Sequence, residues 1–143
     1  MIYIPDTISF NMIRGDTFEL PIIINKGTQL DFEPYYLQDD EKLYIGITQP
    51  NESFENAIIR KVLTNDDLTD DDGNIVLILK PEDTMYLMPG KYYITIKLYK
   101  NNNIRTILNQ KLFFITGSKL IEYEKSDPEF IHSTDNDIKW IIL

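Results

Sequence analysis

Residues 74–99, NIVLILKPEDTMYLMPGKYYITIKLY, decide the fold of this chain. The run at 75–79 is short, apolar and rich in β-branched side chains, and Pro81 ends it. After a turn at 85–90, residues 91–99 alternate between apolar and mainly polar positions. The apolar positions of that alternation are Tyr92, Ile94, Ile96 and Leu98. Because successive side chains of a strand point to opposite faces, the stretch predicts two strands joined by a tight crossover.

The composition of the chain favours a single β-rich domain. The chain has 143 residues, a length typical of one domain or of one domain with an arm. Ile, Tyr, Phe and Thr are abundant, and they suit a pleated surface. Alanine, the strongest helix former, occurs only at Ala57. The absence of cysteine excludes disulfides and thiolate metal sites.

The charge balance bears on the partners of the chain. The net charge is −9 and the sequence pI is about 4.5, which argues against binding to nucleic-acid phosphates or to anionic membranes. The first residues lack the basic and apolar regions of a signal peptide. No apolar run approaches the roughly 20 residues that span a bilayer. We therefore expect neither a nucleic-acid partner nor a membrane.

Alternating or apolar runs recur along the chain and are separated by turn-forming residues. Five further strands are predicted, at residues 7–13, 17–25, 41–48, 57–64 and 104–116. With the two strands of the opening stretch, this makes about seven strands at the spacing of an all-β sandwich or barrel. The only helical candidate is one turn at 82–86.

Three finer expectations follow from these runs. Pro21 cannot donate a hydrogen bond to a neighbouring strand, so its strand should lie at a sheet edge or carry a bulge. The connection 26–40 holds several apolar side chains and should pack on the sandwich. In the last strand, Leu108, Leu112 and Phe114 should share a face.

After Gly117 the sustained alternation stops, which predicts a domain at residues 1–117 and an arm at residues 118–143. The arm carries small apolar groups between polar spacers. These groups are Leu120, Ile121 and Tyr123, then Phe130 and Ile131, then Trp140, Ile141, Ile142 and Leu143. An apolar tetrapeptide that begins with tryptophan suits a buried interface. Docking of the arm on a partner is therefore favoured over docking on its own domain.

The acidic loop at 65–74, NDDLTDDDGN, offers the oxygen ligands that calcium prefers. If Asp72 and Gly73 take the fifth and sixth places of a helix-loop-helix calcium loop, however, leucines fall on the first and last ligand positions. A solvated turn between two strands is the favoured interpretation. We predict no metal site, with calcium in this loop as the open alternative.

Other short motifs also have simpler interpretations. Arg14-Gly15-Asp16 matches an adhesive tripeptide, but it sits where a strand-to-strand turn is expected. His132 is the only histidine, and the chain has no nucleophile-elbow pattern. We therefore predict no catalytic residues and no cofactor.

Several short motifs occur along the chain in an order that resembles a known type of domain. RGDTF at 14–18 opens a strand, DGNI at 72–75 enters the apolar strand, and PGKYYI at 89–94 enters the next strand. RTI at 105–107 and FFIT at 113–116 follow. This series resembles the small immunoglobulin-like domain of many phage and prophage structural proteins. It is similar to the N-terminal domains of baseplate upper proteins, and the match covers residues 7–117.

The resemblance implies an immunoglobulin-like antiparallel β-sandwich with an extended arm. It also implies a non-enzymatic component of a bacteriophage virion that contacts other virion structural proteins and is oligomeric in the assembled particle. Capsid decoration and a baseplate or tail accessory or adaptor are the roles that fit. Baseplate upper proteins continue into long fibre-like or receptor-binding regions, whereas this chain continues only into the arm, so receptor binding is not expected.

Two tyrosine features complete the expectations. Tyr92 lies where immunoglobulin-like sandwiches place a tyrosine corner, in which the hydroxyl bonds to upstream backbone. Tyr44, Tyr93 and Tyr99 are predicted to point outward. A row of exposed tyrosines would suit a carbohydrate-binding module, and this is the alternative function.

Overall fold

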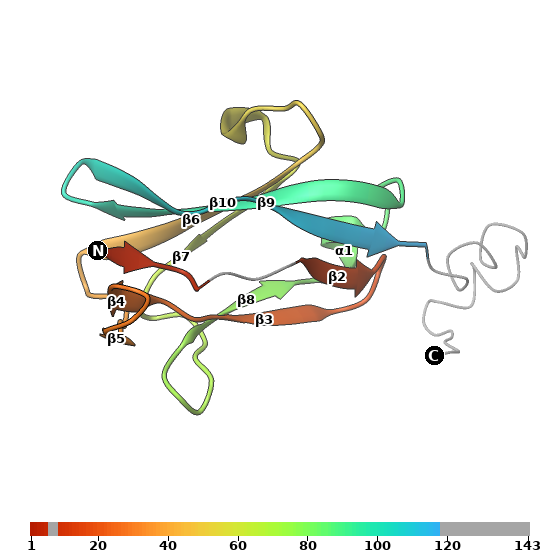
Figure 1. Ribbon diagram of the computed structural model, residues 1–143. Helices are drawn as coiled ribbons and strands as arrows, with labels where there is room; N and C mark the ends of the chain where they lie inside the picture. The colour runs from red at the N-terminus through yellow and green to blue at the C-terminus, as the bar shows by residue number, and fades with distance from the viewer. Residues whose placement is uncertain (6–8, 118–143) are drawn as a thin grey trace, which may run out of the picture.

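The computed structural model describes residues 1–5 and 9–117, and it confirms the predicted all-β sandwich (Figure 1). The larger layer is a five-stranded sheet with the strand order β2-β10-β9-β6-β7. Its strands are Phe10–Ile13 (β2), Asn103–Thr116 (β10), Gly90–Lys100 (β9), Glu41–Thr48 (β6) and Ile59–Leu63 (β7).

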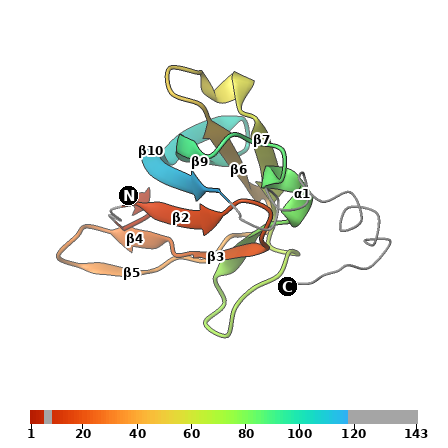
Figure 2. The ribbon, with the colours of Figure 1, turned by 90° about the vertical axis from the view of Figure 1, so that its right-hand side faces the viewer.

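Two smaller sheets form the facing layer. Strands Phe18–Ile22 (β3) and Ile75–Leu79 (β8) pair with each other. Strands Ile2–Tyr3 (β1), Asn25–Gly27 (β4) and Phe32–Pro34 (β5) form a sheet in the order β1-β4-β5. Figures 1 and 2 both show β3, β8, β4 and β5 beneath the five-stranded sheet. The two short helices are Phe54–Asn56 (η1) and Pro81–Thr84 (α1).

The strand order resembles that of variable-type immunoglobulin sandwiches. Strands β10, β9, β6 and β7 follow the order G, F, C, C′, while β3 and β8 take the places of strands B and E. One pair differs from the predicted antiparallel arrangement. Strand β2 runs parallel to β10, with Phe10 opposite Phe113. Parallel strands require a long crossover, and here the whole of the intervening chain supplies it.

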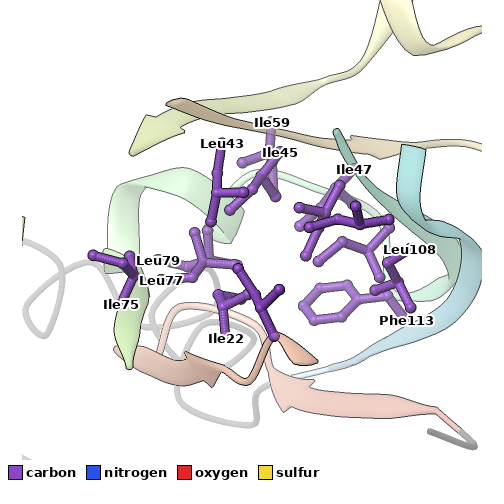
Figure 3. Packing of buried hydrophobic residues seen from close by; sticks show 14 of the residues in the cluster. Ile22, Leu43, Ile45, Ile47, Ile59, Ile75, Leu77, Leu79, Leu108 and Phe113 are labelled. Carbon is purple, nitrogen blue, oxygen red and sulfur yellow. The ribbon is translucent and has the colours of Figure 1, made fainter. Parts of the chain in front are cut away.

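The predicted inward residues of β6 and β9 are confirmed, but Gly46, Thr48 and Thr95, at alternate positions on the other face, are buried as well. Leu43, Ile47 and Ile94 are fully buried between the layers, and the other inward residues of these two strands are nearly so. Phe113 of β10 is also fully buried, and its ring meets the ring of Phe18 edge-on at a centroid distance of 5.6 Å. Figure 3 shows Phe113 and Leu108 beside the aliphatic side chains of both layers. Burial of each such side chain contributes about 1.5–3 kcal/mol.

The expectation for the last strand is partly wrong. Leu108 is buried, but Phe113 and Ile115 face the core, while Leu112 and Phe114 are only half-buried. The pairing with β9 shifts on both sides of Leu108. These shifts mark a bulge, where extra residues on one strand reverse which side chains point inward. Before the bulge, residues 103–106 are all exposed, and after it the buried positions are one residue out of phase with the predicted ones.

The expectation for Pro21 is confirmed, and that for residues 26–40 is only partly confirmed. Among the described residues, β3 pairs with β8 alone, so Pro21 lies on an edge strand. The connection contains the unpredicted hairpin of β4 and β5. Leu37 is buried, whereas Leu30 is 99% exposed and Phe32 is 55% exposed. The hairpin therefore extends away from the core.

The crossover between β8 and β9 is held by polar contacts. The Tyr92 hydroxyl donates a hydrogen bond to the Met88 carbonyl oxygen at 2.5 Å, which is the contact expected of a tyrosine corner. The Arg14 guanidinium donates to the Leu87 carbonyl oxygen at 3.2 Å. The Gly15 amide donates to the Thr84 hydroxyl at 2.9 Å. The turn after β2 is thus bound to the crossover.

Candidate interaction surfaces

The acidic loop uses two of its carboxylates to shape its own turn. Asp67 accepts a hydrogen bond from the Thr64 amide at 2.7 Å, and Asp70 accepts one from the Asn74 amide at 2.9 Å. The Asn74 amide is the main reason why the pKa of Asp70 lies below its ordinary value. Within residues 1–5 and 9–117, no group of three or more His, Asp or Glu side chains is placed to hold a metal ion.

The Arg14-Gly15-Asp16 tripeptide forms a turn whose arginine faces the interior. Arg14 is only 7% exposed. Gly15 has a φ of 85°, a conformation that glycine adopts without steric cost. The Arg14 guanidinium is buried and donates a hydrogen bond to the Leu87 carbonyl oxygen of the crossover. The tripeptide therefore does not present the exposed arginine that an adhesive site needs.

An apolar hollow of about 240 Å³ opens between the layers, and we call it the edge hollow. Every described side chain that lines it is apolar. They are Ile4, Pro5, Phe10, Leu20, Pro21, Ile22, Ile23, Ile96 and Leu108. Three of these, Ile22, Ile96 and Leu108, belong to the buried core, so the hollow reaches the centre of the sandwich. At its rim, Ile23 is 52% exposed.

The edge hollow lies where the first residues of the chain pass from the smaller layer to the larger one. Strand β1 pairs with β4 in the smaller layer, yet the Ile4 amide donates to the Ile107 carbonyl oxygen of β10 in the larger layer. The start of the chain therefore crosses from one layer to the other beside β3. Pro21 lies on the edge of β3 and offers no amide hydrogen for another strand.

A row of apolar side chains crosses four strands on the outer face of the five-stranded sheet. Val62 of β7 lies opposite Tyr44 of β6, and Tyr99 of β9 lies opposite Ile104 of β10. The Tyr44 and Tyr99 rings connect the two halves, with centroids 5.8 Å apart. Ile104 is 64% exposed and Val62 is 51% exposed. We call these four residues the outer-face row.

A second hollow, of about 330 Å³, lies against this row, and we call it the aromatic hollow. Its lining residues are Tyr44, Phe54, Glu55, Lys97, Tyr99 and Ile104. Phe54 comes from η1 and covers Gly46, where a β-carbon would sit 2.8 Å from the ring. The Lys97 ammonium lies 4.5 Å from the centroid of the Phe54 ring.

Sequence reasoning found part of the aromatic hollow. The outward positions of Tyr44 and Tyr99 were expected, and both residues line it. Tyr93 is half-buried on the same strand but does not line it. Phe54 was missed, because the loop that carries it has no periodicity. A glycine inside strand β6 was the available signal, since such a glycine often marks a close approach of another group.

The predicted arm residues cannot be placed on either surface. Leu120, Ile121, Tyr123, Phe130, Ile131 and residues 140–143 all lie outside the described part of the chain, as does His132.

No protein-family model matches the chain, and no curated protein matches its sequence. No helix among the described residues is long and apolar enough to cross a membrane.

Proposed function

We propose that this chain is a non-enzymatic structural protein of a bacteriophage virion and acts through protein–protein contacts. It serves as a capsid decoration protein or as a baseplate or tail accessory or adaptor. The edge hollow is the observation that carries the proposal. The core residues Ile22, Ile96 and Leu108 line this apolar hollow. Burial of apolar surface is favourable, so a partner that covers the hollow would be stabilised there.

The occupant proposed for the edge hollow is residues 140–143 of a neighbouring copy, Trp-Ile-Ile-Leu. These side chains have the apolar chemistry of the lining, and tryptophan is enriched among the residues that dominate interface energy. A segment of one copy that fills a different surface on the next makes a heterologous contact. Such contacts close into rings when the rotation between copies allows it.

The link to a virion comes from the order of the sequence motifs. The RGDTF, DGNI, PGKYYI and FFIT motifs resemble those of immunoglobulin-like domains in phage structural proteins. These motifs lie at strand starts and strand ends of the sandwich, and the edge hollow opens between its layers. A scaffold of this kind suits a subunit that joins neighbours.

Removal of residues 137–143 from the full chain tests the proposal. We expect the melting temperature to stay within about 2 °C, because the proposal places these residues against a neighbouring copy and not against their own domain. We expect self-association in sedimentation equilibrium, and incorporation into phage particles, to fall at least tenfold. Normal incorporation of the shortened chain would rule out the assembly role of this segment.

A pair of substitutions tests the edge hollow itself. Ile23→Asp places a charge at the apolar rim and should weaken self-association as strongly as the deletion. Ile58→Asp is the matched control, because Ile58 is 40% exposed and lies outside the hollow. Equal effects of both substitutions, or no effect of either, would contradict the proposed occupant.

A further inference from the structure

We propose that the aromatic hollow is a carbohydrate-binding site. The hollow lies on the outer face of the five-stranded sheet, whereas the edge hollow opens between the layers. The site therefore adds a ligand to the proposed assembly role and does not rest on it. A subunit at a particle surface could use both, one for its neighbours and one for a saccharide.

The floor of the site is formed by two tyrosines on neighbouring strands. Tyr44 of β6 lies diagonally across from Tyr99 of β9, because Tyr44 pairs with Lys97 and Lys42 pairs with Tyr99. Diagonal neighbours on a sheet face are within reach of each other's aromatic rings. The Tyr99 hydroxyl donates to the Asn102 side-chain oxygen at 2.9 Å, which orients the Tyr99 ring. The floor is thus built on rigid strands.

The wall of the site is the loop that carries η1, which stands above the five-stranded sheet in Figure 1. Phe54 can lie against the sheet only because residue 46 is glycine, whose missing β-carbon leaves room for the ring. Lys97 packs its ammonium over the same ring. The wall is therefore held in place by contacts with β6 and β9.

A negatively charged side chain, Glu55, and a positively charged one, Lys97, line the hollow together with the aromatic rings. Glu55 accepts hydrogen bonds from its own amide and from Ser53, and the first of these is the main reason why its pKa lies below the ordinary value. Its carboxylate is therefore ionised near neutral pH and has lone pairs left for further donors. The Lys97 ammonium has three donor hydrogens. An acceptor and a donor thus border an apolar floor.

This combination suits a sugar ring better than a protein partner. A pyranose has a face of C–H bonds that packs on aromatic rings, and a rim of hydroxyls that both donate and accept. A hollow of about 330 Å³ falls at the small end of the range for small-molecule sites, which are mostly apolar with a few placed polar groups. A stable protein interface involves about 20–30 residues on each side, whereas the outer-face row has four residues.

The test is a printed glycan array probed with the full chain. We expect retention of at least one class of saccharide. Tyr44→Ala and Tyr99→Ala should each weaken binding about tenfold, because each removes one ring of the floor. Tyr99→Phe keeps the ring and should bind within about threefold of the original chain. Tyr86→Ala is the matched control, since Tyr86 is 87% exposed and does not line the hollow.

The outcomes separate this site from the assembly proposal. Folding of each variant is checked by its melting temperature, and Tyr44→Leu, which also removes the ring but keeps more of the side-chain volume, replaces Tyr44→Ala if the alanine variant unfolds. Failure to bind any glycan overturns the proposal, as does binding that neither tyrosine affects. Self-association that depends on Tyr44 and Tyr99, without glycan binding, also overturns it and makes the row a protein contact. None of these results changes the prediction for Ile23→Asp.

Discussion

At the scale of single residues, the crossover before β9 depends on buried polar groups. Tyr92 is 4% exposed, and its hydroxyl bonds to the Met88 carbonyl oxygen. Burial raises the pKa of Tyr92, and the Arg14 guanidinium offsets part of that rise. Arg14 is also buried, and its Nε atom has no hydrogen-bond partner within residues 1–5 and 9–117. These residues stabilise the crossover through their hydrogen bonds.

Tyr92→Phe removes the tyrosine-corner hydrogen bond and leaves the Met88 carbonyl oxygen without this donor. We expect the free energy of unfolding to fall by about 0.5–1.5 kcal/mol, the usual net value of one such bond. Urea denaturation at neutral pH measures the change. Tyr86→Phe is the control, because the exposed Tyr86 should contribute nothing measurable. Equal stability of the Tyr92→Phe variant and the original chain would contradict the structural role.

At the scale of elements, helix α1 is joined to strand β7 by an ion pair. The Lys61 ammonium lies 2.9 Å from the Asp83 carboxylate, which also accepts the Lys80 amide at 2.7 Å. Burial raises the pKa of Asp83, but the hydrogen bond and charge of Lys61 and the Lys80 amide outweigh it. The pKa of Asp83 therefore lies below its ordinary value.

Lys61→Met should destabilise the protein in a pH-dependent way. The folded-state pKa of Asp83 is depressed, so its contribution is present above the unfolded pKa of about 3.9 and is lost as the pH falls through the folded pKa. We expect a loss of about 0.2–1 kcal/mol at pH 7, since the pair is partly exposed to water.

Urea denaturation at pH 7 and at successively lower pH values down to about 2 measures the effect of Lys61→Met. The difference from the original chain should shrink steadily below the ordinary pKa of Asp83. Lys42→Met, on the exposed face of β6, is the matched control and should show no such pH dependence. A difference that stays constant with pH would show that packing of the Lys61 stem, and not the ion pair, is responsible.

At the scale of the whole molecule, Phe113 connects both layers. It lies on β10, which pairs with β2 and β9, and its ring contacts Phe10 of β2 and Phe18 of β3. Its side chain is fully buried. Loss of this ring would therefore affect the packing between the two layers of the sandwich.

Phe113→Ala should lower the free energy of unfolding by about 3–5 kcal/mol, the range for large aromatic side chains removed from a core. Thermal or urea denaturation measures the loss. Ile104→Ala on the same strand is the control, because Ile104 is 64% exposed, and its effect should stay within about 0.5 kcal/mol. A loss below about 1 kcal/mol for Phe113→Ala would contradict its central place in the core.

The sequence by itself determined the longer strands and, for most of them, which face is buried, whereas the short strands β1, β4 and β5 were not predicted. Strands β6 and β8 match the predicted bounds, and the inward residues of β9 are the predicted ones. The reason is local: side chains alternate with period two, so a run of apolar and polar residues encodes both the strand and its buried face.

The tertiary structure alone decided three other features. The bulge in β10 turned Phe113 and Ile115 toward the core in place of Leu112 and Phe114, because pairing with β9 sets the register there. Glu41 is only 2% exposed, because the Tyr35 hydroxyl and the Gln38 amide reach its carboxylate. Both hollows join residues from distant segments of the chain, Phe54 with Tyr99 in one case and Ile4 with Leu108 in the other. Such contacts depend on which strands become neighbours, and local periodicity carries no information about that choice.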